Sequence, residues 1–160
     1  VLLPWTLLEA ATMRTRSVLP DRLADLVVFV VARRLGCPWC VDYSAALWQR
    51  RGLAPGLLHA AAQWRSHPEL FDQTARAAFA FAEAATTQPI APTDELAVEL
   101  RRLVGEAGLV EVAYWAALEN MRSRFNASLG LASQGFSETC AVPASSLPTL
   151  RDAGPRHEHA

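Results

Sequence analysis

Two cysteines three residues apart, Cys37 and Cys40, are the residues of this chain best suited by type and spacing to do chemistry. A CxxC pair can form and break a disulfide, or it can supply two ligands to a metal. Ser44 follows Cys40 at helical spacing, and residues three and four apart share one face of a helix. Both sulfurs and the Ser44 hydroxyl are therefore expected to open into one pocket. At the start of a helix, backbone N–H groups stabilise a thiolate and lower a cysteine pKa from about 8.5 to roughly 3.5–7.5.

Two predicted helices place the cysteine pair at an elbow. Residues 21–35 are apolar nearly all round and stop at Gly36, which suits the position after a helix end. A second helix is predicted over 38–51, with Pro38 in the first turn, where proline is tolerated. The pair therefore lies at the start of the second helix.

Asp25 is the one acidic residue inside the apolar stretch of the first helix. It precedes Cys37 by twelve residues, which is about three helical turns. If the two helices pack together, its carboxylate can approach the sulfurs. The structural alternative is a carboxylate that pairs with Arg22 or favours the helix dipole.

The rest of the chain predicts helices and contains no segment that alternates convincingly enough for a strand. The fold class is therefore all-α, a compact bundle of about six helices in one domain over residues 1–136. The tail 137–160 scatters prolines among polar residues, which predicts an arm against a partner subunit or a disordered segment. The other predicted helices are 7–13, 57–64, 69–85, 93–107 and 109–129, with the last two separated at Gly108.

Composition narrows the class of protein. The chain has 160 residues, of which 51% are hydrophobic, so a buried core is expected. A net charge of -1 argues against nucleic acid as the main partner. No apolar run approaches the roughly 18–20 residues that span a membrane, and no convincing signal peptide begins the sequence. These features predict a cytoplasmic protein with no membrane partner, whose CxxC is redox-active or metal-binding.

Three separated segments carry a family resemblance: LPDRLAD at 19–25, GCPWCVD at 36–42, and ENM at 119–121 with RFNASLG at 124–130. Together they resemble the alkylhydroperoxidase D-like, carboxymuconolactone decarboxylase superfamily, over roughly residues 15–136. The resemblance implies an all-helical fold and oligomers whose subunits share helices.

The resemblance also implies roles for the site residues. Cys40 would attack a hydroperoxide, Cys37 would resolve the sulfenic acid as a disulfide, and an external dithiol protein or small thiol would reset the pair without a bound cofactor. Asp25 stands where the family has a glutamate, and Ser44 stands where it has a histidine. A serine hydroxyl is not a base near neutral pH. Asp25 acting through water would then be the base, and slower peroxide reduction is expected.

Other functions are alternatives on the same scaffold. A redox sensor or an oligomeric binding protein would need no proton relay. A lactone decarboxylase-like enzyme is a further alternative, but the cysteine pair argues against it, because the decarboxylase branch of the superfamily lacks that pair. A zinc site would need further ligands such as Cys140, His157 and His159. His59 and His67 are expected to be ordinary surface or capping residues. The apolar helix faces exceed what one small bundle hides, which predicts a homo-oligomer.

Overall fold

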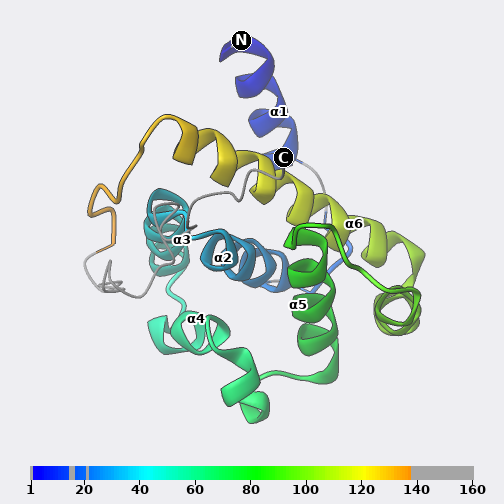
Figure 1. The fold of residues 1–160 in the computed structure, drawn as a ribbon. Helices are drawn as coiled ribbons and strands as arrows, with labels where there is room; N and C mark the ends of the chain where they lie inside the picture. Colours follow the sequence, from blue (N-terminus) through cyan, green and yellow to red (C-terminus); the bar gives the residue numbers. More distant parts are fainter. Residues whose placement is uncertain (1, 15–16, 21, 138–160) are drawn as a thin grey trace, which may run out of the picture.

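The computed structural model describes residues 2–14, 17–20 and 22–137. This part of the chain contains six α-helices, two short 3-10 helices and no strand, which confirms the predicted all-helical class (Figure 1). In the same residues, no helix is both long and apolar enough to cross a membrane. The α-helices are α1 (Leu2–Arg14), α2 (Leu23–Leu35), α3 (Pro38–Arg50), α4 (Pro55–Ala61), α5 (Gln73–Thr86) and α6 (Asp94–Ser128).

Helix α2 is the centre of the bundle. In Figure 1 it runs through the middle of the molecule, and it contacts α3, α4, α5 and α6. Its side chains Val27, Phe29 and Val31 are at most 1% exposed. A helix that is apolar nearly all round needs cover on most of its surface, and its neighbours provide this except on the face of Ala24, Asp25 and Val28, which is partly buried.

Two helices begin or end away from their predicted positions. Helix α5 begins after Asp72, whose carboxylate accepts a hydrogen bond from the Ala75 N–H at 2.7 Å. The predicted start at residue 69 was wrong because Pro68–Leu70 form a separate 3-10 helix. Helix α4 ends at Ala61, before the residue 64 predicted, and another 3-10 helix, Trp64–Ser66, follows it.

The predicted break at Gly108 was also wrong, because α6 is interrupted at Gly105 instead. Gly105 has the non-helical angles φ 74° and ψ 177°, in a region that favours glycine. Gly108 lies buried inside the second half of the helix. A Cβ atom there would lie 2.6 Å from Val104 Cβ and 3.4 Å from Leu19 Cδ2. This glycine therefore permits a close approach rather than ending a helix.

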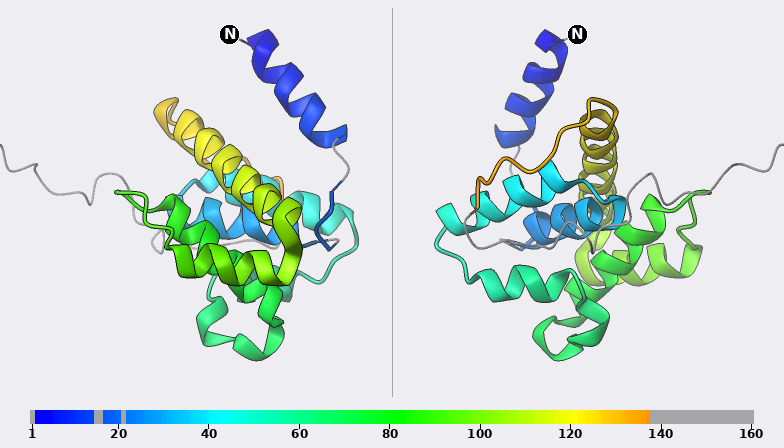
Figure 2. Two further views of the ribbon diagram at one scale, coloured as in Figure 1. Left: turned by 90° about the vertical axis from the view of Figure 1, so that its right-hand side faces the viewer. Right: turned by 60° about the vertical axis from the view of Figure 1, so that its left-hand side comes forward.

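Helix α1 starts at Leu2, earlier than predicted, and projects from the bundle (Figure 2). Its side chains reach α6 at three places. The Trp5 and Phe125 rings stack with centroids 4.6 Å apart, and the Thr12 and Tyr114 hydroxyls lie 2.6 Å apart. The third contact is an ion pair between Glu9 and Arg122. These three contacts fix the position of α1 relative to α6.

After α6 the chain turns back to α3 and binds Asp42. The carboxylate of Asp42 accepts hydrogen bonds from the N–H groups of Gln134, Phe136 and Ser137 at 2.9–3.0 Å. It also accepts one from the Ser133 hydroxyl at 2.9 Å. Burial acts to raise the pKa of Asp42, but these hydrogen bonds outweigh it and lower that pKa. The predicted arm lies, from residue 138 onward, outside the described residues.

Candidate active site

The predicted elbow carries a disulfide between Cys37 and Cys40. Gly36 ends α2 in the left-handed conformation with φ 66°, and Cys37 then caps the start of α3. The Cys37 sulfur accepts a hydrogen bond from the Cys40 N–H at 3.2 Å. The start of the helix therefore stabilises negative charge first on Cys37, the residue at its cap.

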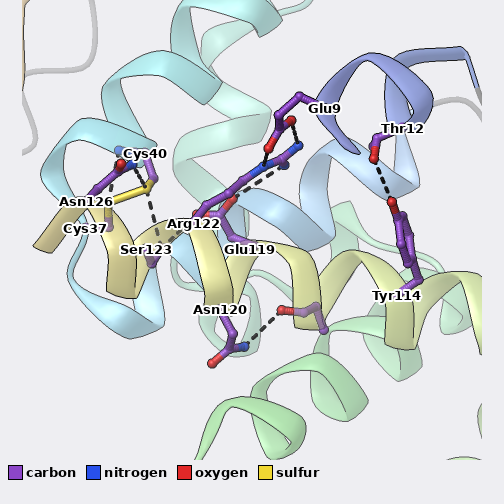
Figure 3. A network of polar contacts seen from close by, with 11 residues as sticks. Glu9, Thr12, Cys37, Cys40, Tyr114, Glu119, Asn120, Arg122, Ser123 and Asn126 are labelled. Atoms are coloured by element: carbon purple, nitrogen blue, oxygen red, sulfur yellow. Dashed lines mark hydrogen bonds and ion pairs between the residues drawn. A yellow bond between two sulfur atoms is a disulfide. The ribbon is translucent and has the colours of Figure 1, made fainter. Parts of the chain in front are cut away.

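The two sulfurs differ in their surroundings. Cys40 lines a cavity, whereas Cys37 is 2% exposed and is not part of the cavity wall. The Cys40 sulfur receives two hydrogen bonds from α6, from Ser123 Oγ at 3.4 Å and from Asn126 Nδ2 at 3.3 Å (Figure 3). Donors of this kind stabilise a thiolate, so Cys40 has both access to the cavity and support for a negative charge.

Glu119 extends this network away from the sulfur. The Ser123 hydroxyl lies 2.8 Å from Glu119 Oε1 and can donate to it, and both residues are 2% exposed. Burial raises the pKa of Glu119 to about 7, although the Ser123 hydrogen bond and the Arg122 charge lower it. Arg122 Nη1 lies 3.8 Å from Glu119 Oε2 and also pairs with Glu9, whose charge raises that pKa. Both protonation states of Glu119 are therefore accessible near neutral pH.

The cavity beside Cys40 has a volume of about 850 Å³ and is bounded by residues of α1, α2, α3 and α6. Aromatic rings form much of its wall, which suits an apolar or aromatic ligand. Charged side chains of Arg22, Arg51 and Arg122 lie among them. The aromatic residues are Trp5, Trp39, Tyr43, Trp48, Trp115 and Phe125.

Asp25 and Ser44, the other two predicted site residues, line the same cavity as Cys40. Asp25 forms an ion pair with Arg51, the residue that follows α3, and not with Arg22, the partner that its position in the sequence suggested. Within the part of the chain that the structure describes, no hydrogen bond joins Ser44 to either sulfur. The hydroxyl that does contact Cys40 belongs to Ser123. The roles of Asp25 and Ser44 in the reaction stay predictions.

Three polar residues of α6 were not predicted as site residues: Glu119, Ser123 and Asn126. Their spacing of four and then three residues places them on one face of the helix. That face is otherwise buried against the bundle, as Val112 and Ala116 are 0% exposed. A buried polar stripe on a core helix is the signal that could have identified them, because buried polar groups need partners.

Among the described residues, the predicted histidines and metal ligands do not add to this site. Neither His59 nor His67 is part of the cavity wall, and His67 Nδ1 lies 3.7 Å from Glu69. Among residues 2–14, 17–20 and 22–137, no group of three or more histidine, cysteine or acidic residues is arranged to hold a metal ion. The tail residues of the zinc alternative, Cys140, His157 and His159, lie outside the described residues.

Comparisons with known proteins agree with the fold. The uncharacterized protein YnjA of Escherichia coli (strain K12) is 34% identical over 131 residues, which are 81% of this chain and 69% of YnjA. The apo crystal structure of the debrominase Bmp8 is similar with a TM-score of 0.67 at 24% identity. That similarity covers 74% of this chain but only 63% of Bmp8, and it shows a shared fold. No family model matches the chain.

Proposed function

We propose, for a chain that belongs to the same family as Escherichia coli YnjA, that Cys40 and Cys37 carry out the thiol-dependent reduction of a hydroperoxide. The observation that carries this proposal is the asymmetry of the pair. Cys40 lines the cavity and its sulfur has two hydrogen-bond donors, whereas Cys37 is the helix cap and is not part of the cavity wall. The fold shared with the debrominase Bmp8 supports an enzyme, and the resemblance of the CPWC segment supports thiol chemistry.

The proposed reaction is a two-electron reduction. The Cys40 thiolate attacks the outer oxygen of ROOH, the O–O bond breaks, and Cys40 becomes a sulfenic acid. The leaving alkoxide takes a proton and departs as ROH. Cys37 then attacks the Cys40 sulfur, and the hydroxyl leaves as water with the proton of the Cys37 thiol. The pair is oxidised to the disulfide and the peroxide is reduced.

Reduction of the disulfide follows from the same asymmetry. An external dithiol can reach the Cys40 sulfur through the cavity, so the mixed disulfide forms at Cys40. Cys37 then leaves as a thiolate, which the Cys40 N–H at the helix start stabilises. A second thiol of the reductant releases Cys40. This proposal needs a dithiol reductant and a reducing compartment such as the cytoplasm.

A second candidate is reductive dehalogenation, which the aromatic wall of the cavity and the likeness to a debrominase favour. The Cys40 thiolate would attack the bromine of an activated bromoarene, and the carbanion would take a proton. Cys37 would then displace bromide from Cys40 and close the same disulfide. Both candidates consume two thiols, so they differ only in the electrophile.

The test measures turnover of cumene hydroperoxide and of an activated bromoarene, tribromophenol, by the full chain with dithiothreitol as reductant. We expect peroxide turnover that is lost in Cys40→Ser. Without reductant, Cys37→Ser should consume one equivalent of peroxide and form no internal disulfide. Unchanged turnover in Cys40→Ser would refute the proposal. Bromide release without peroxide consumption would select the second candidate. Disulfide formation without turnover of either compound would instead favour a redox sensor.

We also propose that the chain forms a homo-oligomer. Leu3 and Leu7 of α1 are 70% and 61% exposed, and Val110 of α6 is 60% exposed. Exposed apolar side chains in such numbers often mark contacts between subunits. A stable, folded monomer in sedimentation at micromolar concentration would contradict this.

A further inference from the structure

The family resemblance leaves Cys40 without its usual base, since Ser44 stands where a histidine is expected. The structure supplies a different route for the proton. A chain of contacts leads from the Cys40 sulfur to Ser123 Oγ at 3.4 Å and from there to Glu119 Oε1 at 2.8 Å. All three residues are at most 4% exposed, and Ser123 lies between the other two, so its hydroxyl is the group that joins them directly.

The Ser123 hydroxyl cannot satisfy both neighbours in one protonation state. It carries one hydrogen, which it donates either to Glu119 or to Cys40. When Glu119 is ionised, the hydrogen points to the carboxylate. When Glu119 is protonated, the carboxyl donates to Ser123 Oγ, and the serine hydrogen points to the sulfur. The direction of both hydrogen bonds of Ser123 therefore reverses when Glu119 gains or loses one proton.

We propose that Glu119, acting through the Ser123 hydroxyl, receives the proton that the Cys40 thiol loses and returns it later in the cycle. This inference rests on the proposed thiol chemistry. The Cys40 thiol gives its proton to Ser123 Oγ, and the serine proton moves to Glu119 Oε1. One negative charge thereby moves from the carboxylate to the sulfur. Glu119, which lines the cavity, then gives this proton to the leaving alkoxide, which departs as ROH. Asn126 Nδ2 remains on the sulfur throughout as the second donor.

Helix α1 contributes to this relay through Glu9. Arg122 lies between Glu9 and Glu119, and it binds Glu9 in an ion pair while staying 3.8 Å from Glu119. Glu9 thereby keeps the arginine from pairing closely with Glu119. The other charged groups on this cavity are Asp25 and Arg51, which neutralise each other, and Arg22. Glu9 and Arg122 are positioning residues in this scheme.

The relay is tested by alkylating Cys40 with iodoacetamide as a function of pH. The protein is the reduced full chain with Cys37→Ser and Cys140→Ser, so that Cys40 is the reporting thiol. Two coupled groups titrate in two steps. We expect the alkylation rate to rise in two steps with Glu119 present and in one step in Glu119→Gln. Glu9→Gln should move the first step to lower pH, because Arg122 is released toward Glu119 and a repelling charge is removed. A merely structural role for Glu119 would not produce these changes.

A second readout is the rate at which cumene hydroperoxide oxidises Cys40. Glu119→Gln and Ser123→Ala should each lower it on the order of 10²-fold, with helical content unchanged. Glu106→Gln, at an exposed position of α6, serves as the matched control and should leave the rate unchanged. Identical alkylation profiles and oxidation rates with and without Glu119 would overturn the relay while leaving peroxide reduction intact. A further outcome is that the unmodified chain turns over no peroxide while the alkylation profile of the Cys37→Ser, Cys140→Ser protein still depends on Glu119. In that case the relay stands and the proposed function fails.

Discussion

Replacing Glu119 by glutamine should change how the stability of the oxidised protein depends on pH. Burial raises the pKa of Glu119 from its ordinary value of 4.5 to about 7. A carboxyl with a raised pKa binds its proton more tightly in the folded state than in the unfolded state. Its stabilising contribution is complete below pH 4.5 and is lost as pH rises through 7. At 1.36 kcal/mol per pKa unit, the loss amounts to roughly 3 kcal/mol.

Glutamine imitates the protonated acid, so the two proteins should be similarly stable at about pH 4. At about pH 8 the glutamine variant should be more stable by roughly 3 kcal/mol. Urea unfolding of both proteins with the disulfide intact measures the difference, because all other titrations cancel. Asn126→Ala is the control, since it removes an uncharged partner of Cys40 and its effect should not vary with pH. A difference between wild type and Glu119→Gln that stays constant from pH 4.5 to 8 would refute the picture of a buried, desolvated carboxyl.

Three further predictions concern other parts of the site. Asn126→Ala removes a donor from the Cys40 sulfur and should slow alkylation of the reduced thiol at neutral pH roughly tenfold, because hydrogen bonds to charged groups are worth about 1.5–3 kcal/mol. Asp42→Asn should lower the free energy of unfolding by about 2–3 kcal/mol, since the four donors of residues 133–137 lose a charged acceptor, and urea unfolding measures it. Ser44→His places a base on the cavity wall and should raise peroxide turnover at neutral pH by about tenfold or more; no gain in steady-state assays would mean that this position is too far from Cys40.

Much of the scaffold around the disulfide follows from local sequence. Gly36 and Pro38 predict the elbow between α2 and α3, because glycine suits a left-handed helix end and proline suits a first turn. The apolar surface of residues 21–35 predicts a helix at the centre of the bundle, and α2 contacts four other helices. Gly105 and Gly108 could not be ranked by the same reasoning. A side chain at Gly108 would meet Val104 and the distant Leu19, and the contact with Leu19 cannot be read from the local sequence.

The partners of the site residues were the part that the sequence could not provide. Asp25 and its partner Arg51 are 26 residues apart, and Ser123 and Cys40 are 83 apart. Helical periodicity says which residues share a face of one helix but does not say which face meets which. The contact between α3 and α6 places Ser123, rather than Ser44, beside the Cys40 sulfur.

The return of the chain from α6 to Asp42 bears on how the disulfide opens and closes. Two neighbouring residues of α3 are held by the segment 123–137. Cys40 is bound by side chains of α6, and Asp42 is bound by residues 133–137. With both points held, the start of α3 cannot swing outward when the sulfurs separate. The motion is left to rotation of the two short cysteine side chains, without a collective helix movement, which would take microseconds or longer. Opening and closing of the disulfide are then expected to leave the position of α3 unchanged.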